Sequence, residues 1–118
     1  LKKNDFFFVI MDLIEKHCLP CKGGMLPLTE EEEDKYKKEI PAWKLIRADP
    51  HKLMKAFSFK GFKESMNFVN KVADVAEKEC HHPDIYIFYN KVNIELYTHA
   101  VKGLSESDFI IAAKIDAL

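Results

Sequence analysis

Two pairs of strand-like segments on either side of one amphipathic helix most strongly constrain what this chain can fold into. Residues 53–59 alternate between apolar and polar side chains, which is typical of a strand with one buried face, and residues 43–46 form a shorter strand before them. A second pair covers residues 85–89 and 92–98. Between the pairs, apolar residues recur every three or four positions from about residue 63 to 78, which predicts a helix. Because strands joined by tight turns run antiparallel, the pattern predicts an antiparallel sheet.

Capping residues place two further helices, one before and one after the strand pairs. Thr29 and Glu32 have the spacing of a capping box, and Pro41 ends the helix that they begin. Ser105, followed three residues later by Asp108, begins the last helix. The order helix, two strands, helix, two strands, helix predicts an α+β fold, a four-stranded antiparallel sheet with helices packed on one face.

Two helical patterns are interpreted as structural rather than functional. The acidic run of residues 30–34 is predicted to be a solvated helix face that complements the helix dipole. In the middle helix, an apolar stripe with an aromatic residue and a methionine is predicted to be core rather than a ligand pocket. The residues of that stripe are Phe62, Met66, Val69, Ala73 and Ala76.

Length and charge limit the organisation and the partners of the chain. A chain of 118 residues forms one domain and buries roughly 65% of its unfolded surface. We assign residues 18–118 to that domain, and residues 1–17 to a leader or N-terminal helix without a catalytic role. The formal charge of −1 disfavours nucleic acid as a partner. No run reaches the ~20 apolar residues of a membrane span, so no membrane partner is expected.

Cysteine usage indicates the compartment. Three cysteines, an odd number, make a disulfide framework unfavourable and predict a reducing compartment, the cytoplasm or the nucleus. Cys18 and Cys21 have the Cys-x-x-Cys spacing of half a zinc site, which His17 or Cys80 could complete. The glycine pair and the proline that follow favour an irregular loop, and we interpret the cysteine pair as structural, with a metal site as the alternative.

Three of the five histidines, His81, His82 and His99, lie close together in the sequence. The unperturbed pKa of histidine, about 6.5, lets it give and take protons near neutrality. The group suggests either a three-histidine metal site with an open position or acid–base chemistry on a small polar substrate. Adjacent histidines rarely bind one ion, because their side chains diverge in extended chain, and this favours acid–base chemistry. Satisfied structural histidines at a helix end and a sheet edge are the third interpretation.

The turn between the last two strands predicts which residues face one another. Asn favours the positive φ of tight hairpins, so Asn90 and Lys91 are expected to form a two-residue turn. In that register His82 falls opposite His99, where Cβ atoms are roughly 4.5–5.5 Å apart. A turn one or two residues longer would still leave His81 or His82 near His99.

The residues around the histidines follow a distinctive spacing. In chain order they are Glu77, His81, His82, Pro83, Tyr89, His99 and Asp108. This spacing resembles the signature of the pterin-4a-carbinolamine dehydratases. Further segments between residues 18 and 118 are similar to the same family, namely Leu28–Glu32, Ile40–Trp43, the rhythm Phe57-x-Phe59-x-x-Phe62, and Gly103–Ser105.

The resemblance implies a reaction and a set of site residues. Members of the family dehydrate 4a-hydroxytetrahydropterins to quinonoid dihydropterin in pterin recycling, with no cofactor and no metal. Carried over to this chain, His81 and His99 are expected to be the catalytic acid–base pair. His82, Glu77 and Asp108 are expected to bind the substrate, although Asp108 is also explained as a helix cap and Glu77 as a helix-surface acid.

One position departs from the family, and one alternative function stays open. Many members have an aromatic residue two positions after the proline, where this chain has Ile85, so pterin packing and substrate preference are expected to differ. In animals a relative also stabilises dimers of a homeodomain transcription factor. A non-catalytic pterin-binding or protein-dimerisation module is therefore the alternative.

Assembly is predicted from the one-sided sheet. An uncovered strand edge invites pairing with another chain, which predicts a homodimer or homotetramer, as the resemblance also implies. The last helix is expected to have more apolar surface than one sheet face requires, so the sheet edge and this helical surface are the candidate interfaces. The apolar residues of that helix are Phe109, Ile110, Ile111, Ile115 and Leu118.

Overall fold

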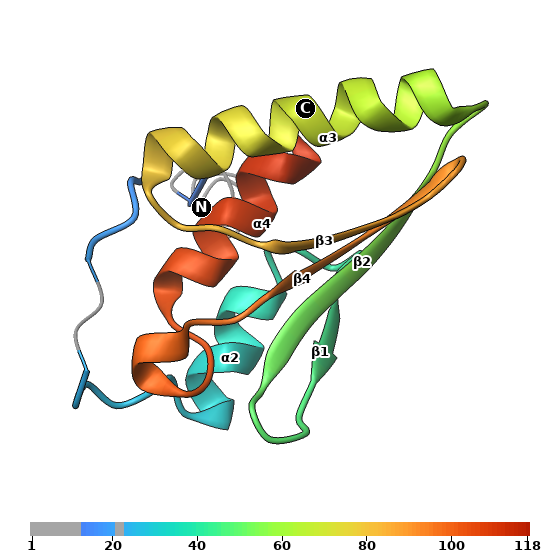
Figure 1. Ribbon diagram of the computed structural model, residues 1–118. Helices are drawn as coiled ribbons and strands as arrows, with labels where there is room; N and C mark the ends of the chain where they lie inside the picture. Colours follow the sequence, from blue (N-terminus) through green and yellow to red (C-terminus); the bar gives the residue numbers. More distant parts are fainter. Residues whose placement is uncertain (1–12, 21–22) are drawn as a thin grey trace, which may run out of the picture.

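Four strands form one antiparallel sheet in the computed structural model, which describes residues 13–20 and 23–118. The strand order is β1-β2-β4-β3, so β1 and β3 are the edges (Figure 1). Each neighbouring pair is antiparallel. The strands are β1 (Lys44–Ile46), β2 (Lys52–Ser58), β3 (Asp84–Phe88) and β4 (Lys91–Leu96).

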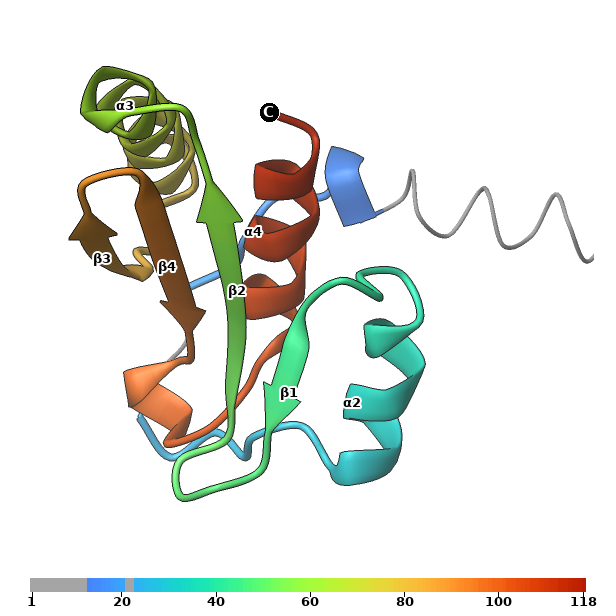
Figure 2. The same ribbon diagram turned by 90° about the vertical axis from the view of Figure 1, so that its right-hand side faces the viewer.

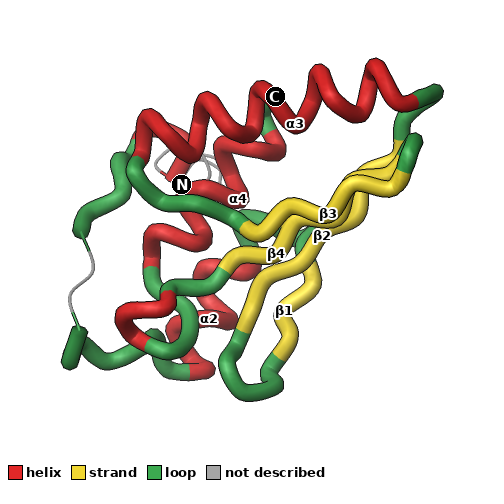
Figure 3. The backbone as a smooth tube through the Cα atoms, viewed as in Figure 1, coloured by secondary structure: helices red, strands yellow, loops and turns green. Residues whose placement is uncertain are grey.

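Helices cover one face of this sheet. They are α2 (Glu30–Lys37), α3 (Phe62–Glu79) and α4 (Glu106–Asp116), and the 3-10 helix η1 (His99–Val101) lies beyond the end of β4. In Figure 2 the strands lie in front of α4, and α3 begins near the upper end of β2 and runs away from the viewer. Figure 3 shows how helices and strands follow one another along the backbone. The predicted α+β fold and its element order are confirmed. Residues 13–15 are also helical, and the remainder of the predicted leader helix, residues 1–12, lies outside the described residues.

The core lies between the sheet and α4. The sheet contributes Leu53, Val92, Ile94 and Leu96, all fully buried. On α4 the buried apolar residues are Phe109, Ile110, Ile111, Ala112, Ala113 and Ile115. As expected, this helix has more apolar surface than one sheet face requires, but Tyr36 of α2, α3 and the buried Leu13 cover the sides that the sheet does not.

The helix α2 begins as predicted but is not solvated on all its acidic positions. Thr29 and Glu32 form the predicted capping box, in which each side chain accepts a hydrogen bond from the backbone N–H of the other residue. Glu33, however, is fully buried, so the interpretation of residues 30–34 as a solvated face is wrong at this position. Its carboxylate is held by Arg47 at 3.1 Å and His51 at 2.8 Å, which compensate for its burial.

The buried stripe of α3 differs in part from the predicted one. Val69 and Ala76 are buried as expected, but Ala73 and Phe62 are exposed. The buried line instead includes Ser65 and Val72, at a spacing of three and four residues. The reason is that α3 packs against both α4 and β4. The residues of α3 that face these two elements form a line slightly rotated from the line of its largest apolar residues.

The predicted hairpin turn is wrong by two residues in register. Phe88 pairs with Lys91 and Ile87 with Val92, so Tyr89 and Asn90 form the turn. Tyr89 rather than Asn90 takes the positive φ, 42°. The carbonyl of Asn90 accepts a hydrogen bond from Phe59 N–H at 2.8 Å, which ties the turn to the end of β2. A shift of two leaves every side chain on its predicted face, so the apolar pattern could not distinguish the two registers.

Candidate functional site

The end of α3 fixes the direction in which the chain leaves this helix. Cys80 is left-handed, with φ 53°, and its N–H donates to the carbonyl of Glu77 at 3.4 Å. The N–H of His81 donates to the carbonyl of Ala76 at 3.2 Å. These two bonds form a Schellman motif, which ends the helix and satisfies its last carbonyls. The position of His81 is therefore set by backbone hydrogen bonds.

A network of hydrogen bonds joins His81 to the start of α4. Its Nε2 lies 2.7 Å from Oδ1 of Asp108, whose other oxygen accepts from Thr98 Oγ1 at 2.7 Å and from Ser105 N–H at 2.9 Å. Asp108 is fully buried, whereas the side chain of His81 remains 15% exposed. A buried carboxylate that receives donors on both oxygens is well satisfied. Asp108 is thus the predicted helix cap and at the same time the partner of His81.

This arrangement selects one ring nitrogen of His81. An ionised carboxylate can only accept, so Nε2 of His81 carries the proton that is shared with Asp108. In the neutral imidazole, Nδ1 is then the unprotonated nitrogen and the one available to a ligand. The geometry suits a histidine that accepts a proton while a buried carboxylate orients it.

His82 is placed in a different environment. Its Nε2 lies 2.5 Å from Oε2 of Glu77, and the two side chains are 60% and 78% exposed. An exposed contact of this kind contributes little to stability, because water solvates both partners. The predicted site residues His82 and Glu77 therefore lie together at the surface, where a ligand could reach both.

His99 begins η1 shortly after the end of β4 and is exposed. Its Nδ1 lies 3.0 Å from the hydroxyl of Tyr97, and the two ring centroids are 4.2 Å apart. Lys52 places its Nζ 5.0 Å from the centre of the Tyr97 ring and pairs with Glu95 at 3.3 Å. Tyr97 was not predicted as a site residue, because strand alternation alone gave no reason to distinguish it from its neighbours.

The predicted pairing of His82 with His99 is wrong, because the hairpin register differs. The last observed pair is Asp84 with Glu95. Continued outward, this register would set His82 opposite Tyr97 and His81 opposite Thr98. Each histidine therefore has its own partner, and two of the three pairs, His81 with Asp108 and His82 with Glu77, join residues predicted from the sequence.

The segment before α2 is fastened to the same end of α3 through Glu79. This buried carboxylate accepts from Cys18 N–H at 2.9 Å and lies 2.9 Å from His17 Nδ1 and 3.5 Å from Lys114 Nζ. Burial acts to raise the pKa of Glu79, but the hydrogen bonds of Cys18 and His17 and the charge of Lys114 outweigh it and hold the pKa below its ordinary value.

In the described part of the Cys-x-x-Cys segment, Cys18 makes the contacts of a structural residue. Burial raises the pKa of the Cys18 thiol to about 11, and its Sγ lies 3.7 Å from the carbonyl of Ser107. A thiol of this kind is a poor metal ligand near neutrality, because the thiolate is the ligating form. Cys21 lies outside the described residues. Within residues 13–20 and 23–118, no group of three or more His, Cys, Asp or Glu side chains is arranged to hold a metal ion.

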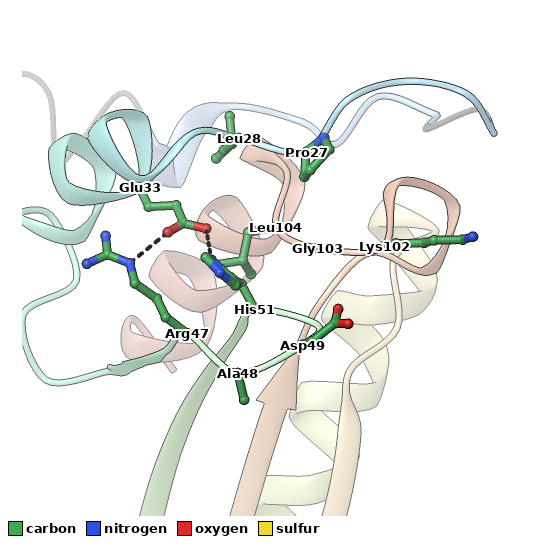
Figure 4. Close-up of a pocket in the computed structure, with 10 residues that line it drawn as sticks. All are labelled: Pro27, Leu28, Glu33, Arg47, Ala48, Asp49, His51, Lys102, Gly103 and Leu104. Atoms are coloured by element: carbon green, nitrogen blue, oxygen red, sulfur yellow. Dashed lines mark hydrogen bonds and ion pairs between the residues drawn. The ribbon is translucent and has the colours of Figure 1, made fainter.

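A separate cavity of about 320 Å³ lies between α2, the β1–β2 loop and the segment after η1 (Figure 4). Glu33 reaches across it to Arg47 and His51, as the dashed lines in Figure 4 mark. These bonds join α2 to the β1–β2 loop and explain why an acidic residue is buried here. We assign the cavity no part in the histidine chemistry, because its lining contains neither His81, His82 nor His99.

The fold and the histidine–carboxylate network together define a class of protein, a small α+β domain with histidine and carboxylate side chains joined where α3, β4 and α4 meet. Residues 26–118 match the family model described as pterin 4 alpha carbinolamine dehydratase. This chain belongs to the pterin-4-alpha-carbinolamine dehydratase family. None of the helices in the described ranges is long and apolar enough to cross a membrane.

Individual proteins are similar over most of the chain. A protein of Rubrobacter xylanophilus named "Putative pterin-4-alpha-carbinolamine dehydratase" is 44% identical over 107 residues, which cover 91% of this chain and 98% of that protein. The crystal structure of a transcriptional coactivator/pterin dehydratase from Brucella melitensis is 32% identical with a TM-score of 0.72, covering 77% of this chain and 96% of that one. A pterin dehydratase-like protein identified as a RuBisCO assembly factor in the alpha-carboxysome is 27% identical with a TM-score of 0.56, covering 64% of this chain and 87% of that one.

Proposed function

We propose that this protein dehydrates a 4a-hydroxytetrahydropterin to quinonoid dihydropterin and water, with His81 and His99 as the acid–base pair. The observation that carries the proposal is the bond from the partly exposed His81 to the fully buried Asp108, in a chain of this family. We further propose that the protein acts in the cytoplasm and needs neither metal nor cofactor for this step.

The reaction needs two proton transfers. The proton on pterin N5 leaves, the bond between C4a and the hydroxyl oxygen breaks, and the departing hydroxyl takes up a proton to become water. The electron pair of the N5–H bond forms the new double bond between N5 and C4a. Each transfer is accelerated when a positioned side chain accepts or donates the proton in the transition state.

The contacts of the histidines suggest a division of labour. His81 has its Nε2 proton shared with Asp108, so its Nδ1 is suited to accept the N5 proton. His99 would then protonate the departing hydroxyl. His82 and Glu77, which form an exposed pair beside His81, would bind and orient the pterin ring through their polar groups.

A direct assay tests this function. Purified protein is added to freshly generated 4a-hydroxytetrahydropterin, and the rate of dehydration is compared with the spontaneous rate. We expect the protein to accelerate dehydration and to keep this activity after treatment with a chelator. A rate equal to the spontaneous one would contradict the proposed function, and a chelator-sensitive rate that zinc restores would support a three-histidine metal site instead.

A second function, assembly of another protein, is suggested by the names of two similar structures. One is described as a transcriptional coactivator as well as a pterin dehydratase, and the other as a RuBisCO assembly factor. A protein that acts only by assembly or dimerisation would leave the spontaneous dehydration rate unchanged, so the same assay separates the two functions.

A further inference from the structure

We infer that Tyr97 is a positioning residue for His99. The hydroxyl of Tyr97 occupies Nδ1 of the His99 imidazole and leaves Nε2 as the nitrogen that exchanges a proton with the substrate. The inference rests on the proposed function, because it assigns a role within the dehydration site. It adds a residue that neither the family spacing nor the histidine cluster identifies.

The contact between the two side chains is specific. The hydroxyl of Tyr97 lies 3.0 Å from Nδ1 of His99, within hydrogen-bond distance, and the rings are tilted by 44° at a centroid separation of 4.2 Å. Either group can be the donor, depending on the tautomer of the imidazole. In both tautomers Nδ1 is engaged, and Nε2 is the ring nitrogen that remains for a ligand.

An exposed histidine needs such a contact to have a defined orientation. His99 is exposed at the first position of a three-residue helix, where its backbone restricts the ring little. A ring free to rotate would present either nitrogen and lose entropy when the substrate binds. A hydrogen bond to one nitrogen removes this freedom before binding, which favours proton transfer from a fixed position.

The neighbouring strand in turn holds Tyr97. Leu53 pairs with Leu96, so Lys52 lies opposite Tyr97 in the same register, and its Nζ is 5.0 Å from the ring centre. The hydrogen bond to Glu95 raises the pKa of Lys52 above its ordinary value, which keeps the cation charged over the ring. The series Glu95, Lys52, Tyr97, His99 therefore links the sheet to the histidine.

The first test removes only the hydroxyl. Tyr97→Phe keeps the ring, and Tyr36→Phe is the matched control, since it also removes one tyrosine hydroxyl and its hydrogen bond, here to Glu106. We expect Tyr97→Phe to lower kcat about tenfold, the effect of one lost hydrogen bond, with little change in KM or melting temperature. Tyr36→Phe should match the wild-type rate. Equal kcat values in the two variants would overturn the inference.

The second test asks whether Tyr97 acts through His99. In a His99→Ala background, Tyr97→Phe should have no further effect, because the group that it positions is gone. An undiminished effect in that background would mean that Tyr97 contacts the substrate itself, and would overturn the positioning role. In parallel, the Nδ1 chemical shift of the His99 ring should differ between the wild type and Tyr97→Phe, because the variant lacks the hydroxyl that bonds this nitrogen.

The nitrogen shifts separate failure of this inference from failure of the proposed function. A wild-type protein that leaves the spontaneous rate unchanged would overturn both. An active wild-type protein whose His99 shifts are identical in Tyr97→Phe would overturn the inference about Tyr97 alone.

Discussion

Asp108 is the residue on which three elements of this protein converge. Its carboxylate accepts from His81 after α3, from Thr98 after β4, and from the N-cap Ser105 of α4. Asp108 is fully buried. A donor that loses this acceptor would therefore lose its hydrogen bond without gaining one to water. The same side chain therefore stabilises the fold and orients a proposed catalytic histidine.

Replacing this carboxylate by an amide should affect stability and activity together. Asp108→Asn turns one accepting oxygen into a donor, which then faces His81 or Thr98 without a partner. We expect a loss of about 1–3 kcal/mol in the free energy of unfolding, measured by urea denaturation, together with a fall in kcat. Asp74→Asn, an exposed position of α3, is the control. Wild-type stability in Asp108→Asn would show that the network is not formed.

At the scale of single residues, the sequence predicted the cap formed by Asp108, which the structure confirms. Glu77, His81, His82, His99 and Asp108 stay predicted as site residues from their spacing. The contact between Tyr97 and His99 could not be predicted, since it depends on the distance between two side chains that follow β4. The burial of Glu33 also depends on Arg47 and His51, which are distant in sequence.

Among the elements, α3 determines where the site lies, because its last turn sets the path to His81. That turn ends in a left-handed residue that is not glycine, Cys80, with φ 53°. Residues with a Cβ adopt this conformation at a cost of roughly 1–2 kcal/mol, whereas glycine adopts it without that cost.

A glycine at this position should therefore stabilise the protein. We expect Cys80→Gly to raise the free energy of unfolding by about 1 kcal/mol, part of the gain being offset by the greater freedom of glycine in the unfolded chain. Cys80→Ala, which also removes the thiol but retains the Cβ, serves as control and should not gain stability. A Cys80→Gly protein less stable than Cys80→Ala would contradict the assigned Schellman motif.

The anchoring of the N-terminal segment on α3 should depend on pH. The pKa of Glu79 lies below its ordinary value of 4.5, so its contribution is present above that pH and is lost as the pH falls through the lowered pKa. We expect Glu79→Gln to lose about 1–3 kcal/mol at neutral pH, because Cys18 N–H and His17 lose a charged acceptor. The difference from the wild type should narrow on acidification below about pH 4. The same stability difference at neutral pH and below about pH 4 would contradict the lowered pKa of Glu79.

The order of the elements was predictable because each is encoded locally, by period, cap or turn. The register of the β3–β4 hairpin was not, since the two candidate registers keep the same residues on the same face. The bond from Phe59 N–H to the carbonyl of Asn90 extends the β2–β4 pairing by one residue and joins segments that are distant in the chain. Such a contact has no local signal.

For the whole molecule, the edge strand β3 is the candidate surface for assembly. Exposed large apolar side chains gather on this strand and its turn, namely Tyr86, Ile87, Phe88 and Tyr89. The apolar residues of α4 are largely buried in the core, so the sheet edge is the stronger of the two predicted interfaces. We propose that the protein is a homodimer or homotetramer that pairs through this edge.

A charge on that edge should dissociate the assembly. Phe88→Lys is expected to shift the protein to monomer at micromolar concentration, measured by light scattering, because a lysine side chain would be buried without a partner. Leu26→Lys, at a residue that is 89% exposed, is the control and should keep the wild-type mass. A wild-type monomer would refute the proposed assembly, and an unchanged mass in Phe88→Lys would place the interface elsewhere.

The dehydration rates of alanine variants show whether His81 and His99 carry out acid–base catalysis of pterin dehydration. We expect His81→Ala and His99→Ala each to lower kcat by about 10²–10⁴-fold, while His51→Gln, a histidine bonded to Glu33 outside the site, keeps the wild-type rate. All variants should retain the wild-type circular dichroism spectrum. A His81→Ala/His99→Ala double variant that dehydrates the substrate at the wild-type rate would show that these two histidines do not catalyse the reaction.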